Sequence, residues 1–199
     1  MNPVDLPLGD QIDLLLEITF RNPVVKEILN TSFFPKNINW YLGAGGICQS
    51  VWNFLSGNEI THGIKDYDLI YYDRSDLSFG AEDVFIQKGK EYWKKYSNLI
   101  EIRNQARVHL WFEKHFGYKI KPLKSCEESI NGWPTTARAI GINKIDQKIN
   151  VYAPYGLNDL FGLVVRPNKL SITKQVYEKK VQKWTSIWPN LKIIKWGKI

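Results

Sequence analysis

"HGIKDYDLIYYD", residues 62–73, places acidic side chains around an apolar run. The segment from Tyr67 onward predicts a buried strand, because aromatic and aliphatic residues dominate it. Side chains two positions apart in a strand share a face, so Asp66 and Asp68 are expected side by side. Neighbouring carboxylates repel each other unless a cation lies between them, and oxygen ligands suit a hard cation such as Mg²⁺. Two solvated carboxylates at an exposed strand end are the alternative interpretation.

A glycine turn lies upstream of this strand. "LGAGGICQSVW", residues 42–52, ends an apolar strand pattern and continues at helical spacing. Free amides and the positive dipole end of a helix N-terminus bind phosphate, so Gly45, Gly46 and Ser50 are candidate nucleotide contacts. The segment has neither the Gly-Lys-Ser/Thr of a Walker loop nor the spacing of a Rossmann loop. A plain tight turn is the alternative.

A third segment, "LIEIR" (residues 99–103), carries a single acid in a strand pattern. Lone acids in such runs are seldom buried without a partner, which makes Glu101 a candidate for a shared site with the aspartates. We expect this strand to lie beside the one at 67–73. Arg103 shares a face with Glu101, so it either contacts a triphosphate or pairs with Glu101 or Asp68.

Helical and strand patterns alternate along the chain, which predicts an α/β (α+β) fold with helices packed on a mixed sheet. We expect one domain over residues 1–199, with a helical extension at 1–35 and a C-terminal helix and possible strand at 168–199. Helices are expected within residues 9–20, 22–34, 45–57, 81–98, 105–117, 125–134 and 171–188. Strands are expected within residues 38–44, 67–73, 99–103 and 191–196, and a hairpin within 137–154 that turns near Asp146.

The composition indicates a globular protein with a basic surface. The chain has 27 Lys and Arg against 20 Asp and Glu, and its net charge of +7 favours anionic or phosphorylated ligands. Cys48 and Cys126 stand far apart, which predicts buried free thiols and argues against a disulfide framework or a zinc site. No apolar segment approaches the roughly 20 residues of a membrane span, and the first residues lack a signal-peptide pattern, so we expect a cytoplasmic protein. The C-terminal lysines are expected to form a solvated helix face: Lys174, Lys179, Lys180 and Lys183.

The three segments resemble, in their order, the nucleotidyltransferase superfamily typified by DNA polymerase β. More narrowly, "VWNFLSG", "DYDLIYYD", "EIRNQARVHLW", "NGWPTTARAIGI" and "APYGLNDLFGLVVRPN" resemble a bacterial nucleotidyltransferase-like family first catalogued as a domain of unknown function. The resemblance runs from about Trp40 to Trp188. It implies a minimal nucleotidyltransferase fold, with a mixed sheet, helices on one side and a carboxylate triad at the sheet edge.

The resemblance also implies a reaction and its residues. Asp66 and Asp68 match the paired metal-binding aspartates, and Glu101 matches the third carboxylate, which also becomes a candidate for accepting the acceptor's proton. Mg²⁺ or Mn²⁺ is the implied cofactor. Gly45 and Gly46 match the phosphate turn. The implied reaction moves an NMP from an NTP to an unknown acceptor, which is a protein, a small molecule or RNA, and releases pyrophosphate.

One departure from the superfamily leaves other functions open. The usual Gly-Ser of the turn is Gly-Gly here, and the first hydroxyl is Ser50. A catalytically silent nucleotide-binding or regulatory module of the same fold is therefore an alternative. A basic RNA-binding protein is a third hypothesis, without a recognised RNA motif. Asp159 is expected to cap a backbone end, and Arg107 to pack on Trp111. Roles are left open for His109, Arg138 and Arg166.

Overall fold

Two N-terminal helices, α1 (Leu8–Phe20) and α2 (Pro23–Leu29), begin the computed structural model, which describes residues 2–197. A 3₁₀ turn at Pro3–Asp5 precedes them. The buried Asn22 caps α2, because its side-chain oxygen accepts hydrogen bonds from the first free amides of the helix. Both helices expected in this region are confirmed, although α2 ends several residues earlier than its sequence pattern.

A five-stranded mixed sheet forms the centre of the fold. Its order is β3-β2-β1-β4-β5, with β2 and β3 parallel and the other neighbours antiparallel. The expected pairing of the two acidic strands is thereby confirmed, and the parallel pair is joined through a helix as such pairs require. The strands are β1 (Asn39–Gly43), β2 (Tyr67–Tyr72), β3 (Ile100–Asn104), β4 (Gly141–Ile145) and β5 (Lys148–Tyr152).

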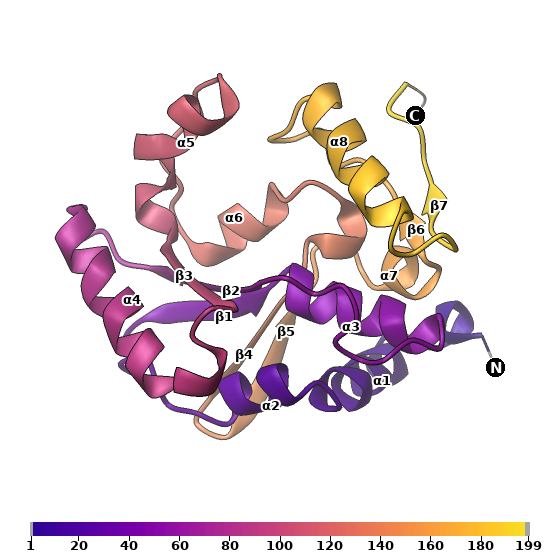
Figure 1. Ribbon diagram of the computed structural model, residues 1–199, viewed down its shortest axis with the longest axis horizontal. Coiled ribbons are helices and arrows are strands. Elements are labelled where there is room, and N and C mark those ends of the chain that lie inside the picture. Colours follow the sequence, from indigo (N-terminus) through magenta and orange to yellow (C-terminus); the bar gives the residue numbers. More distant parts are fainter. Residues whose placement is uncertain (1, 198–199) are drawn as a thin grey trace.

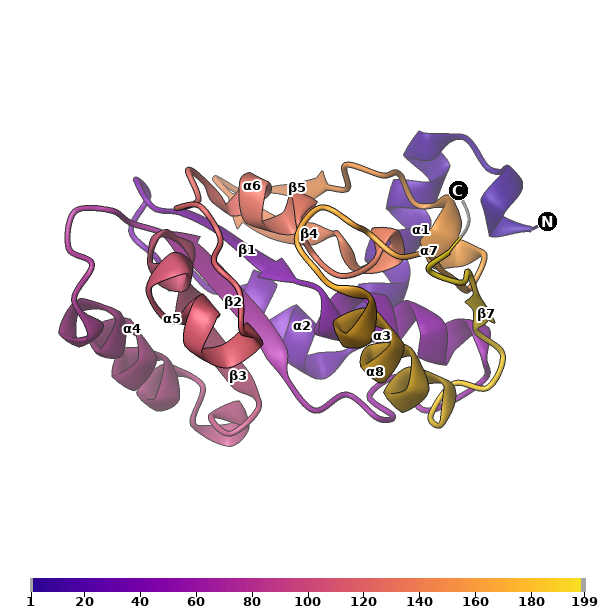
Figure 2. The ribbon, with the colours of Figure 1, turned by 90° about the horizontal axis from the view of Figure 1, so that it is seen from above.

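Helices cover both faces of this sheet. The remaining helices are α3 (Gly45–Leu55), α4 (Phe79–Tyr92), α5 (Val108–Phe116), α6 (Cys126–Asn131), α7 (Asn158–Phe161) and α8 (Lys174–Thr185). Figure 1 shows α1, α2 and α4 on one side, and α5, α6 and α8 on the other. Seen from above, α5 lies near β3 and α8 near α3 (Figure 2). The expectation of helices on one side only was therefore wrong.

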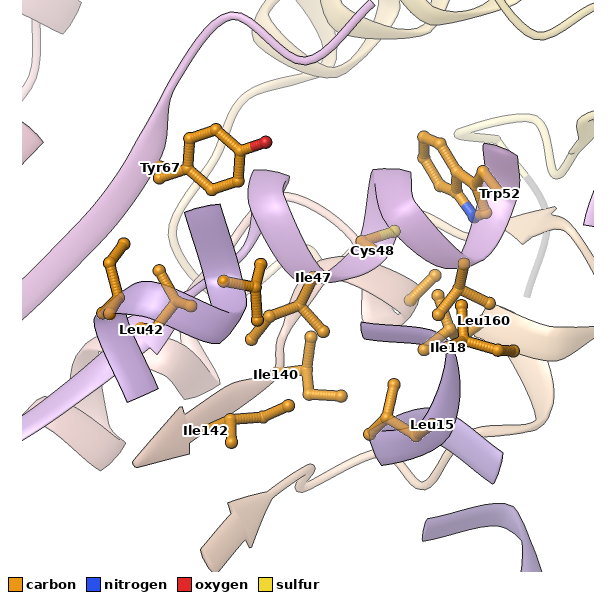
Figure 3. Packing of buried hydrophobic residues seen from close by; sticks show 14 of the residues in the cluster. Leu15, Ile18, Leu42, Ile47, Cys48, Trp52, Tyr67, Ile140, Ile142 and Leu160 are labelled. Atoms are coloured by element: carbon orange, nitrogen blue, oxygen red, sulfur yellow. The ribbon is translucent and has the colours of Figure 1, made fainter. Parts of the chain in front are cut away.

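The main core lies around α3, whose first nine residues are all buried. Figure 3 shows it between the N-terminal helices, the sheet and α7, with side chains that include Leu15, Ile18, Leu42, Ile47, Cys48, Trp52, Tyr67, Ile140, Ile142 and Leu160. A smaller cluster packs α6 against the other face of the sheet, through Tyr41, Ile70 and Ile130. Both cysteines are buried free thiols, as expected. Truncating a core leucine such as Leu15 to alanine should cost about 2–5 kcal/mol.

The second half of the chain confirms the expected hairpin and adds a two-stranded sheet. Asp146 and Gln147 both have positive φ, the conformation that a tight hairpin turn requires. The short strands β6 (Val164–Val165) and β7 (Lys192–Ile193) pair in parallel below α8. Asp159 does not cap a backbone end, because its carboxylate accepts hydrogen bonds from the Thr136 hydroxyl and from Arg166.

The helices are all modest in length. The longest, α4, has 14 residues, whereas a bilayer span needs about 20. Within residues 2–197, no helix combines the length and the apolar character needed to cross a membrane.

Candidate active site

The two aspartates lie where the chain enters β2. Asp66 immediately precedes the strand, Asp68 is its second residue, and both side chains are half-buried. Tyr67 points into the core instead, where its hydroxyl is hydrogen-bonded to Asn22. In the register of the sheet Asp68 lies opposite Glu101 of β3 on one side and opposite Gly43 of β1 on the other. The sheet therefore brings the predicted carboxylates of two segments together.

Glu101 is more open than its sequence suggested. It is exposed on the edge strand β3, so the interpretation of a buried lone acid was wrong. Arg103 lies on the same face and pairs with Glu101, with Nη2 3.3 Å from Oε2. Both side chains are about half exposed, so the pair contributes little to stability and leaves the carboxylate accessible. The pairing alternative for Arg103 is the one realised here.

The glycine turn brings the α3 N-terminus against Asp66. Ala44, the residue before the helix, has φ of 42°, a left-handed conformation that turns the chain sharply out of β1. A Cβ on Gly45 would lie 3.4 Å from Asp66 Oδ1 and 3.5 Å from Arg138 Nη2. A Cβ on Gly46 would lie 2.3 Å from the Tyr67 ring, so no side chain fits there. The Gly-Gly departure from Gly-Ser thus has a steric cause.

The prediction that Ser50 contacts the nucleotide was wrong. Its side chain is fully buried, its hydroxyl donates a hydrogen bond to the Gly46 carbonyl at 2.6 Å, and it accepts one from Asn22. It does not line either cavity beside the aspartates. The hydroxyl links α3 to the Asn22 cap of α2 and is not available to a ligand.

Two cavities meet at Asp68. The larger, of about 330 Å³, opens between α5, α6 and α8 and also borders Glu101. Its walls are mainly apolar and aromatic, and they include Val108, Trp111, Phe112, Phe116, Tyr118, Ile120, Leu123, Trp133 and Ile172. The smaller, of about 210 Å³, borders Asp66 and several cations. Asp68, Arg138 and Lys180 line both cavities, so the aspartate stands at a junction between an apolar space and a charged one.

Arg138 and Lys180 are the charged groups whose place the sequence did not reveal. Arg138 comes from the turn before β4, and its role was left open. Lys180 was assigned to a solvated helix face, but it is half-buried and faces the aspartates, and Lys183 also borders the smaller cavity. A signal for Lys180 existed, since it lies between the buried Tyr177 and Trp184 at helical spacing. Arg138 had no such local signal.

Burial and charge shift the pKa values at this junction. Burial raises the pKa of Asp68 to about 6, and the negative charge of Asp66 acts in the same direction. Arg138 opposes that rise, and Glu101 adds to it more weakly. Burial, and then the charge of Arg138, lowers the pKa of Lys180. Two carboxylates at the start of β2 thus face two basic side chains, those of Arg138 and Lys180, across the smaller cavity.

Comparison with known proteins identifies the group to which this arrangement belongs. The sequence pattern of a family described as nucleotidyltransferase matches residues 37–193. The chain belongs to this nucleotidyltransferase family. The fold is similar to an NMR structure described as a CCA-adding enzyme head domain, with a TM-score of 0.73, 22% sequence identity, and coverage of 92% of this chain and 95% of that one. No curated protein matches the sequence significantly.

The resemblance to nucleotidyltransferases implies a divalent cation, and two carboxylates of this chain fit it. Within residues 2–197, no three His, Cys, Asp or Glu side chains form a group arranged to hold a metal ion. Mg²⁺, however, is usually bound by one or two carboxylates together with substrate phosphates. Asp66 and Asp68 border one cavity, and no hydrogen bond or ion pair among the described side chains involves them. Their oxygens fit such a shared site, with Glu101 nearby.

Other polar residues near the site have structural roles. The prediction that Arg107 packs on Trp111 was wrong. Its guanidinium pairs instead with the buried Glu82 and donates a hydrogen bond to the Leu77 carbonyl at 2.9 Å. Arg166 pairs with Asp159. Lys65, which precedes β2, borders the smaller cavity. His109 borders neither cavity.

Proposed function

We propose that this protein is a metal-dependent nucleotidyltransferase that moves an NMP from an NTP to an acceptor hydroxyl. The observation that carries the proposal is the position of Asp68, which stands beside Asp66 and in register with Glu101 at the junction of two cavities. The α3 N-terminus opens next to the same aspartates. Family membership and fold support the reaction class.

The reaction requires a bond exchange at the α-phosphorus. An acceptor oxygen forms a bond to this phosphorus, the bond to the bridging oxygen breaks, and pyrophosphate leaves with the electron pair. Asp66 and Asp68 would hold Mg²⁺ or Mn²⁺ together with the phosphates, and the cation supplies charge neutralisation at the reacting oxygens. Glu101 lines the larger cavity and is accessible, which supports our assignment of Glu101 as the group that accepts the acceptor's proton.

The larger cavity is our candidate for the acceptor space. It borders Glu101 and Asp68, and its volume of about 330 Å³ suits a ligand of small-molecule size. An RNA end would bring several phosphates, which need basic groups, whereas the walls here are mainly apolar and aromatic. Among a protein hydroxyl, a small molecule and RNA, this lining favours the small molecule.

A silent nucleotide-binding module is the second candidate function. It is favoured by one observation, namely that residues 2–197 contain no preassembled group of three metal-ligating side chains. Such a module would bind an NTP without transferring its NMP. Binding with no transfer to any acceptor in a cell extract would support this candidate over the enzyme.

Thermal unfolding with NTP and Mg²⁺ or Mn²⁺ tests the metal assignment. The metal should raise the midpoint in the presence of NTP, because ligands that bind only the folded state stabilise it. The double variant Asp66→Ala/Asp68→Ala should lose this rise. Asp73→Ala is a matched control, since Asp73 follows β2 and bonds instead to the exposed Ser75. An undiminished rise in the double variant would exclude these aspartates as the metal ligands.

A further inference from the structure

The guanidinium of Arg138 is buried and lacks a hydrogen-bond partner at one of its nitrogen atoms. Its residue surface is only 9% exposed, and its Nη1 atom is buried without a hydrogen-bond partner. No ion pair among residues 2–197 involves this guanidinium. A buried charge without a partner is costly, and a bound anion would remove this cost.

Lys180 adds a second cation on the same wall. The Arg138 guanidinium lies 4.8 Å from the ring centre of Trp184, and the Lys180 ammonium lies 6.0 Å from it. Two cations that share one indole repel each other. Stacking on the ring gives each of them only a small attraction, and a multiply charged anion bound between them would offset their repulsion.

The smaller cavity provides the space for such an anion. It is lined by both cations and by Lys65 and Lys183, against Asp66 and Asp68 as its carboxylates. The α3 N-terminus lies beside Arg138, whose Nη2 would lie 3.5 Å from a Cβ on Gly45, and Gln49 of the same helix lines the cavity. The unpartnered guanidinium and the Lys180 ammonium therefore come from separate segments of the chain and line the same cavity.

We propose that Arg138 and Lys180 bind the polyphosphate tail of the NTP in the smaller cavity. This assignment rests on the proposed function for the identity of the nucleotide. The two cations take over the phosphate contact that a serine hydroxyl at position 46 would otherwise make. No serine fits at this position, since Tyr67 fills the space where a side chain would lie. The guanidinium fits phosphate through paired N–H donors, and the ammonium binds it as a compact charge.

Inorganic tripolyphosphate tests this site apart from catalysis. The background protein is Asp66→Asn/Asp68→Asn in EDTA, because it lacks both the metal and the carboxylate charges that repel the anion. Calorimetric titration should detect binding to this background. Adding Lys180→Gln or Arg138→Gln should weaken it by about tenfold or more, the usual scale for losing a charge-assisted contact. Arg138→Lys should retain part of the affinity.

Lys179→Gln is the matched control, since Lys179 is the exposed neighbour of Lys180 on α8. Its affinity for tripolyphosphate should equal that of the background. Unchanged affinity in Lys180→Gln, an equal loss in Lys179→Gln, or no binding to the background would overturn the proposal, whether or not the Arg138 variant folds. Failure of NMP transfer with these results intact would refute the proposed function and leave the anion site standing.

Discussion

Asp68→Asn is expected to stabilise the metal-free protein at neutral pH. Burial and the neighbouring carboxylates raise the pKa of Asp68 from 3.8 to about 6. A pKa difference of one corresponds to about 1.36 kcal/mol, so the charged form costs roughly 3 kcal/mol of folding free energy above pH 7. An amide removes this cost. No hydrogen bond of the described side chains is lost, because none involves the Asp68 carboxylate.

The effect has a defined pH window. Between about pH 4 and 6 the folded protein keeps the Asp68 proton that the unfolded chain has released, so stability falls as pH rises through this range. The free energy of unfolding of the Asp68→Asn variant should not show this decrease with rising pH. The difference between variant and wild type should therefore be small below pH 4 and should reach its full size above pH 7.

Urea unfolding in EDTA at a series of pH values measures this difference directly. Asp76→Asn is a control of opposite sign, because hydrogen bonds from Ser78 lower the pKa of the exposed Asp76. Its charged form is favoured in the folded state, so the amide should lower stability at neutral pH and not at pH 2. A gap for Asp68→Asn that does not change with pH, or a loss of stability at pH 7.5, would refute the reasoning.

Four further substitutions test how the site is supported. Gly46→Ser should destabilise the protein by about 1–3 kcal/mol in urea unfolding, because its Cβ meets the Tyr67 ring, whereas Gly45→Ala should cost less; equal costs would contradict the steric explanation. Arg107→Leu should cost about 3–5 kcal/mol, because it leaves the buried Glu82 charge unpaired, and a cost below 1 kcal/mol would exclude that role. Ser50→Ala should lower stability by about 1–3 kcal/mol and leave the Kd for tripolyphosphate unchanged. A higher Kd would show that the hydroxyl contributes to anion binding.

The sequence predicted the sheet and helices well because their signals are local. Strand β2 follows from its apolar run, and α3 from helical spacing after a glycine turn. The pairing of Asp68 with Glu101 also followed, since consecutive strands with a helix between them tend to be neighbours. What failed was the burial of Glu101, because sequence alone does not say which strand forms the edge of the sheet.

The predictions that failed at the site depend on long-range contacts. Ser50 has the right residue type near the turn, but its hydroxyl is used by Asn22, which is 28 positions earlier in the chain. Arg138 reaches the aspartates only because β4 pairs with β1 across the sheet. Lys180 reaches them because α8 packs through Trp184 against Trp52 of α3. Local sequence patterns do not predict these long-range contacts.

Transfer of label from α-labelled NTP tests the central claim most directly. With Mg²⁺ or Mn²⁺ and a cell extract as the source of acceptors, the wild-type protein should label an acceptor with at least one of the four α-labelled nucleotides, whereas the label of a γ-labelled NTP should leave in pyrophosphate. Asp68→Asn should lower the rate by about 10²–10³-fold or more, the scale for removing a charge-stabilising group. Equal transfer by Asp68→Asn, or no labelled product with any nucleotide, would contradict the assignment of this site as a nucleotidyltransferase centre.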